Sequence, residues 1–202
     1  MATITTYAEL VTAIGNWFMG RTDIDTDACI DLAEAYLNTR LRCRQMETVT
    51  DLTPTANVCT LPTDYLEYKR VIEKASIRRP LAYITEEGAD SLYALRPSGL
   101  ACHFMIVGSS LTALPLSAND IELTYYAKVP ALSGSATTNW LLTAHPGLYL
   151  HTCLMYAAEF VEDDAKLAKE TQFVGQLLEQ IHALDNRAKF ANAGVTLRGP
   201  VW

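Results

Sequence analysis

The side chains best suited to acid–base catalysis in this chain form one acidic group whose position favours a structural role. Glu159, Glu162, Asp163 and Asp164 are the best candidates for paired carboxylates. They lie between two expected helices, where an aspartate caps the following helix and its neighbours solvate the turn. We therefore predict that Asp163 or Asp164 is an N-cap, and that these acids are not catalytic.

The spacing of histidines and cysteines indicates neither a metal site nor a disulfide framework. None of them forms His-x-x-x-His or Cys-x-x-Cys. They are His103, His145, His151, His182, Cys29, Cys43, Cys59, Cys102 and Cys153. Glycine loops for phosphates or dinucleotides and a Gly-x-Ser-x-Gly elbow are also missing. We expect reduced cysteines, no metal, no cofactor and no enzymatic activity.

The composition predicts a folded protein. Of 202 residues, 50% are hydrophobic and 19% are charged, which excludes a disordered chain. No apolar run reaches the length of a membrane span, and the start MATITTYAELV lacks an export signal, so we expect synthesis in the cytoplasm.

The net charge of −7 argues against non-specific nucleic-acid binding through a broad basic face. An acidic surface keeps proteins soluble, which is the simpler interpretation, and it would also suit a wall past which DNA slides.

Two amphipathic helices are predicted at the N-terminus. Thr6 and Glu9 have the spacing of a capping box, Gly20 can end the first helix, and Asp25 or Thr26 can cap the second. The apolar stripe of the first consists of Tyr7, Leu10, Val11, Ile14, Trp17 and Phe18. The second carries Ile30, Ala33, Leu37 and Leu41, widened by Cys29, Leu32 and Tyr36.

Three arginines follow the apolar stripe of the second helix. Arg40, Arg42 and Arg44 lie where cations complement the negative end of the helix dipole. A cluster that contacts DNA or a partner protein is the alternative interpretation.

The pattern changes to short strands between about residues 48 and 130. The clearest strand is 121–129, where apolar and polar residues alternate. Residues 102–107 and 111–114 flank Gly108-Ser109-Ser110 and predict a hairpin. A short helix is expected over 86–95.

Helices resume after residue 145. Residues 148–161 are almost entirely apolar, which predicts a helix at the centre of the core. We predict an α+β fold, mainly α, in which helices of about 6–45 and 145–186 form a bundle. An antiparallel β region is inserted at about 48–130, so residues 1–186 form a single domain with an extended C-terminal tail.

The tail, residues 187–202, differs from the rest of the chain. It carries Arg187, Lys189 and Arg198 and no acidic residue. Its glycines and Pro200 predict that it does not continue as a regular helix. Its apolar residues have no periodic partner within the tail, so it either binds another protein or folds back on its own domain. The docking residues that we predict are Phe190, Val195, Leu197, Arg198 and Trp202.

Two segments resemble the head–tail adaptor (connector) proteins of tailed bacteriophages. They are Ile121–Ser133 (IELTYYAKVPALS) and Thr138–Pro146 (TNWLLTAHP), followed by the apolar helix that ends in Glu162-Asp163-Asp164. Leu61–Tyr65 (LPTDY), the hairpin at Val107-Gly108 and Thr6–Leu10 (TYAEL) fit the same pattern. The resemblance extends to about residue 185.

This resemblance implies a ring, expected to be a dodecamer, beneath the portal protein in the neck of the virion. Such rings extend the channel for the genomic double-stranded DNA without reading its sequence. They also offer a platform to tail or further neck proteins, such as a stopper or nozzle. Family members commonly reach the portal with a C-terminal extension, so the resemblance implies that residues 187–202 are a docking arm. No membrane partner is expected.

Three alternatives remain at this point. A tail-completion or terminator subunit would also form rings but would bind the tail tube. An enzyme would place Glu159 and Asp163 in a cleft. A sequence-specific DNA-binding module would use Arg40, Arg42 and Arg44.

Overall fold

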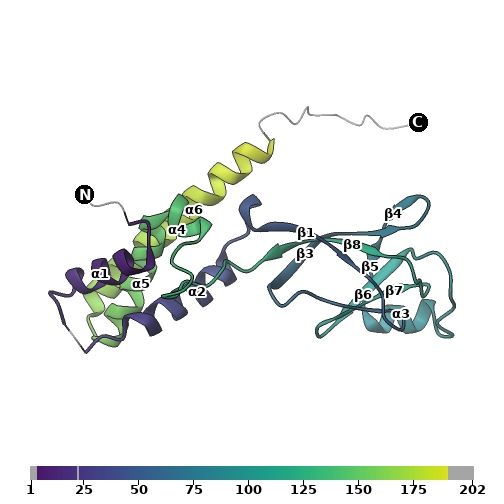
Figure 1. The fold of residues 1–202 in the computed structure, drawn as a ribbon, viewed down its shortest axis with the longest axis horizontal. Coiled ribbons are helices and arrows are strands. Elements are labelled where there is room, and N and C mark those ends of the chain that lie inside the picture. The colour runs from purple at the N-terminus through teal and green to yellow at the C-terminus, as the bar shows by residue number, and fades with distance from the viewer. Residues whose placement is uncertain (1–3, 22, 191–202) are drawn as a thin grey trace. The chain divides into compact units, whose positions relative to one another are not determined.

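The computed structural model describes residues 4–21 and 23–190 of the chain (Figure 1). Two compact units can be distinguished. Met1–Gln45 together with Val129–Trp202 forms a helical unit, and Met46–Lys128 forms a β unit. The limits expected for the insertion, about residues 48 and 130, lie within two residues of this division. That the two units act as one adaptor domain over residues 1–186 stays a prediction.

The fold class is α+β and mainly α, as the sequence predicts. The helical unit consists of α1 (Tyr7–Trp17), α2 (Thr26–Arg40), α4 (Trp140–Ala144), α5 (Pro146–Phe160) and α6 (Asp164–Phe190). The short helix α4 was not predicted; the Asn139 side chain caps it by accepting a hydrogen bond from the Leu142 backbone N–H at 2.8 Å.

The predicted helix starts are confirmed in the structure. Thr6 and Glu9 form a complete capping box, and Asp25 accepts two backbone N–H groups of α2. Asp163, rather than Asp164, accepts the backbone N–H of Lys166 at 3.0 Å, as an N-cap of α6 does. Gly20 lies in the left-handed region (φ 71°), and its N–H returns to the Gly15 carbonyl after the end of α1.

Helix α5 forms the centre of the helical unit, as its apolar sequence predicts. It packs against α1, α2, α4 and α6. Its buried residues include Leu148, Tyr149, Cys153 and Leu154. The predicted contribution of Leu32 to the α2 core is wrong, because this side chain is 50% exposed.

A buried polar cluster links three parts of the helical unit. The Tyr149 hydroxyl of α5 donates a hydrogen bond to the Glu34 carboxylate of α2, and both residues are buried. Glu34 also accepts the backbone N–H of Leu132 at 2.7 Å. Nearby, the Asn38 side chain accepts the backbone N–H of Val129 at 2.8 Å. The chain returning from the β unit is therefore fastened to α2.

Burial governs the ionisation of this cluster. Removal from water raises the pKa of Glu34, although the Tyr149 and Leu132 hydrogen bonds oppose the shift. Burial, and then the hydrogen bond to Glu34, raises the pKa of the Tyr149 phenol. Tyr149 therefore stays protonated and acts as a permanent donor to Glu34.

The β unit contains two four-stranded sheets. The first has the order β1 (Glu47–Leu52), β8 (Ile121–Ala127), β3 (Tyr65–Lys74), β4 (Arg78–Pro80). The second has the order β2 (Val58–Thr60), β7 (Ser110–Leu114), β6 (His103–Val107), β5 (Ala82–Tyr83). One core contains side chains from both sheets, including Val71, Leu123 and Tyr125 from the first and Phe104 and Leu111 from the second.

The predicted hairpin and central strand are confirmed. Strands β6 and β7 pair around Gly108, whose φ of 58° suits a residue without a side chain. Strand β8 buries Ile121, Leu123 and Tyr125 as expected. The insertion was expected to be antiparallel, but β5 pairs with β6 in parallel. The connection between these strands contains α3 (Glu86–Leu92), which supplies the crossover that parallel strands need.

Glu73 on β3 is a completely buried carboxylate with three hydrogen bonds. It accepts the Ser117 hydroxyl at 2.5 Å, the Asn119 amide at 3.0 Å and the Ala101 backbone N–H at 3.2 Å. Burial alone would raise the pKa of Glu73, but these donors outweigh it and lower the pKa. This carboxylate joins β3 to two connecting segments of the β unit, the one before β6 and the one between β7 and β8.

Replacing Tyr149 by phenylalanine should destabilise the helical unit. Tyr149→Phe removes the side-chain donor of the buried Glu34 carboxyl and leaves only the Leu132 N–H, so the free energy of unfolding should fall by about 1–3 kcal/mol. Urea unfolding measures this change. Tyr36→Phe is the matched control on α2, and a half-exposed tyrosine should change stability by less than about 0.5 kcal/mol. Equal effects of the two substitutions would contradict the assigned role of Tyr149.

Glu73→Gln should destabilise the β unit by about 1–3 kcal/mol near neutral pH, because one amide cannot accept from all three donors. A lowered folded-state pKa contributes stability above the unfolded value of about 4.5 and loses it as the pH falls through the folded value. Wild type and variant should therefore converge below pH 4.5, as measured by urea unfolding at several pH values. Glu87→Gln is the exposed control. A difference that stays constant with pH would show that ionisation of Glu73 contributes nothing.

Candidate docking surfaces

The predicted docking arm begins later than the sequence indicates. Residues 187–190 were expected to leave the helix, but they continue α6. Ala188 and Lys189 favour helix, and Lys189 forms an i,i+4 ion pair with Asp185 at 2.6 Å. The arm therefore starts after Phe190, whose side chain is 68% exposed at the end of α6. The other predicted docking residues, Val195, Leu197, Arg198 and Trp202, lie outside the described residues.

The base of the arm is fixed by an ion-pair cluster. Asp185 on α6 is buried, and its carboxylate accepts the backbone N–H of Arg44 at 3.2 Å and its Nε at 3.0 Å. Burial opposes the charge, but Lys189 and Arg44 lower the pKa of Asp185. The last turns of α6 extend beyond the other helices of the unit (Figure 1) and are held by these contacts.

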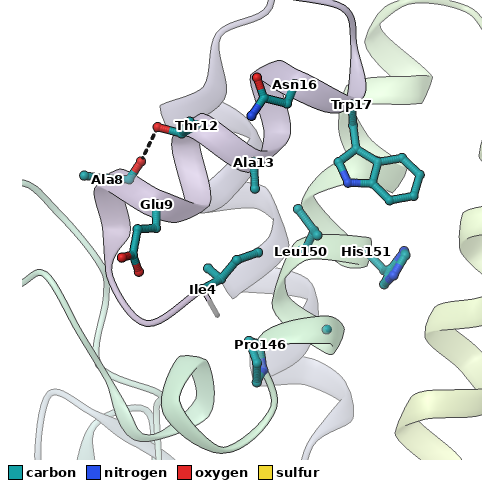
Figure 2. Close-up of a pocket in the computed structure, with 11 residues that line it drawn as sticks. Ile4, Ala8, Glu9, Thr12, Ala13, Asn16, Trp17, Pro146, Leu150 and His151 are labelled. Carbon is teal, nitrogen blue, oxygen red and sulfur yellow. Dashed lines mark hydrogen bonds between the residues drawn. The ribbon is translucent and has the colours of Figure 1, made fainter. Parts of the chain in front are cut away.

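An apolar groove lies between α1 and α5. It has a volume of about 620 Å³. Figure 2 shows Ile4 and Pro146 near one end and Trp17 with His151 near the other. Trp17 was predicted to belong to the buried stripe of α1, but it is 44% exposed in this groove. The α1 stripe is confirmed at Leu10, Ile14 and Phe18, which are buried.

His151 forms part of the groove wall and is held by its neighbours. Its Nδ1 lies 2.6 Å from Oε2 of the buried Glu170. Its ring meets the edges of Trp17 and Phe173, with centroid distances of 5.9 and 4.4 Å. This arrangement bridges α1, α5 and α6 and explains the histidine by packing and hydrogen bonding.

A second, smaller hollow of about 230 Å³ lies between the start of α5 and α6. It is lined by His145, Leu148, Leu177, Ile181 and Leu184 among others. Leu184 is largely exposed beside this hollow. Gly147, in the first turn of α5, lines both hollows.

The arginines after α2 have local partners. Arg42 donates to the carbonyls of Asn38 and Leu41 at 2.8 and 2.6 Å, which are free acceptors at a helix end. The Arg40 guanidinium lies 5.5 Å from the centre of the Tyr36 ring. Arg44 binds Asp185 of α6, so each of the three arginines has a contact within the helical unit, and Arg42 completes the end of α2.

The acidic group at residues 159–164 does not line any of the hollows described above. All of its members are exposed, and Asp163 caps α6. Within residues 4–21 and 23–190, no three histidine, cysteine, aspartate or glutamate side chains gather as metal ligands. In the same part of the chain, no helix has both the length and the hydropathy needed to cross a membrane.

The sequence pattern of the family described as SU10 adaptor protein matches residues 5–198. The chain belongs to this family. The membership predicted from the residues is thereby confirmed, and the protein is a phage adaptor and a structural component of the virion. The match spans both units of the adaptor and continues beyond residue 185, where the resemblance was expected to end. Most of the arm is therefore part of the family pattern. Curated proteins yield no match to this chain.

Proposed function

We propose that this adaptor forms a ring, expected to contain 12 copies, beneath the portal in the neck of a tailed phage. The ring extends the DNA channel and offers a platform to the tail or to the next neck protein. The observation that carries this proposal is the family match across residues 5–198, which includes both units and most of the arm. The role is structural, because the best candidate acids are exposed or cap a helix.

The geometry of α6 supports portal docking by the arm. The arm leaves a helix end that Asp185, Arg44 and Lys189 hold in place. Burying a large side chain such as Trp202 contributes roughly 1.5–3 kcal/mol, so a single arm binds weakly. Arms on a symmetric ring bind together at high effective concentration, which converts weak contacts into stable attachment.

The charge of the chain supports its place around a DNA channel. Its 23 acidic residues exceed its 16 basic ones, so the surface does not retain phosphates. The arm has the opposite character, with Arg198 and no acidic residue beyond Phe190. DNA therefore passes without sequence-specific binding, while the arm binds a protein partner.

Removing residues 191–202 should abolish portal binding and leave the fold intact. This truncation keeps all of α6 and the Lys189–Asp185 pair. Co-expression with the portal protein of the same phage, followed by negative-stain imaging, should show a second ring on the portal for the full chain only. Trp202→Ala should weaken attachment per arm by about tenfold or more, whereas the matched control Asn192→Ala should not.

The outcome also separates the adaptor from a tail-completion subunit. Bare portal rings with a soluble, folded full-length chain would contradict the proposal. Association of the same chain with tail-tube protein would then identify a terminator role. Full retention of portal binding by the truncated chain would overturn the docking arm alone.

A further inference from the structure

Two hollows of the helical unit flank the start of α5. The groove between α1 and α5 and the hollow between α5 and α6 share Gly147 as a lining residue. A side chain built at Gly147 would meet no atom within 4 Å, so the space beside this residue is open. The exposed Trp17 lies along the groove (Figure 2), and the exposed Leu184 borders the smaller hollow. Exposed apolar hollows of this size usually receive a partner.

The arm has the chemistry that the groove between α1 and α5 would bind. Val195, Leu197 and Trp202 offer apolar side chains, and Arg198 offers the one positive charge beyond Phe190. Among the described residues that line the groove, Glu9 supplies a carboxylate and no lysine or arginine is present. An apolar segment with a single cation therefore complements an apolar groove with a single anion.

The arm is also long enough to reach the groove of its own chain. From Ile181, in the smaller hollow, to Phe190 is nine helical residues, or about 14 Å. Twelve residues, 191–202, span up to about 40 Å when extended. After returning along α6, roughly 26 Å of arm remains. The groove follows α1 from Ala8 to Trp17, which is about 14 Å.

We propose that residues 191–202 occupy the groove between α1 and α5 of their own chain before assembly. Trp202 and Leu197 pack among Ala8, Ala13 and Leu150, and Arg198 faces Glu9. The same apolar residues are thereby kept from water until a partner offers a better site. The release of the arm onto the portal rests on the proposed function, whereas its occupation of the groove does not.

The three tryptophans of the chain, Trp17, Trp140 and Trp202, allow a direct test on the full-length protein. Incorporated 5-fluorotryptophan gives three ¹⁹F resonances, and Trp202→Phe and Trp17→Phe each identify one of them by its loss. A soluble gadolinium chelate then reports the exposure of each ring. In the free protein, Trp202 and Trp17 should both be protected from the chelate. Ala8→Arg should place a cation in the groove and increase the relaxation of Trp202 several-fold.

Ala35→Arg is the matched control, since Ala35 is an exposed helical alanine that does not line the groove. It should leave both resonances unchanged. The proposal would be overturned if the chelate relaxed the Trp202 resonance as fast as in a free arm peptide. It would also be overturned if Ala8→Arg left the relaxation of Trp202 unchanged. Protection that disappears on dilution would overturn it too, because the occupant would be the arm of a second copy. The assay contains no portal, so failure to bind portal cannot be mistaken for failure of this inference.

Discussion

The buried hydrogen bond from Tyr149 to Glu34 is the interaction on which the helical unit most depends. A buried carboxyl group that loses a donor destabilises the fold, so Tyr149 stabilises the packing of α2 against α5. The same carboxyl accepts Leu132, and the neighbouring Asn38 accepts Val129. The chain re-entering the helical unit is therefore positioned by the helix that it left.

Within the β unit, Glu47 lies opposite Tyr126, so the first and last strands are also neighbours. A unit of 83 residues, Met46–Lys128, is inserted at one place because both of its ends are held together.

Much of this architecture could be predicted because it is local in sequence. The capping box at Thr6 and Glu9, the cap at Asp25 and the alternation of β8 each occupy fewer than ten residues. The interactions that were missed join distant residues. Glu34 and Tyr149 are 115 positions apart, and Arg44 and Asp185 are 141 apart. A polar residue on an apolar helix face indicates a buried partner, but it does not say which residue that partner is.

The docking role of the tail stays a prediction, and the structure corrects only where the tail begins. Residues 187–190 continue α6, in which Lys189 pairs with Asp185. Trp17 was assigned to the buried stripe of α1 by its helical spacing. Spacing reveals which side of a helix is apolar, but not how far the neighbouring helix covers it. The exposed margin of this stripe lines the groove.

Side chains that could do chemistry are used here to hold elements in place. His151 bonds to Glu170, Asp163 caps α6 and Glu73 gathers three donors in the β unit. The groove beside α1 is lined mainly by apolar side chains, with Glu9 as its carboxylate among the described residues.

The central claim is that this adaptor forms the ring beneath the portal. A cryo-electron microscopy reconstruction of the neck in the intact phage tests it most directly. The account predicts a closed ring of this chain in contact with the portal, with residues 191–202 of each copy lying on the portal and the groove beside Trp17 free of its own arm. A ring of this chain at the end of the tail tube, without portal contact, would contradict it.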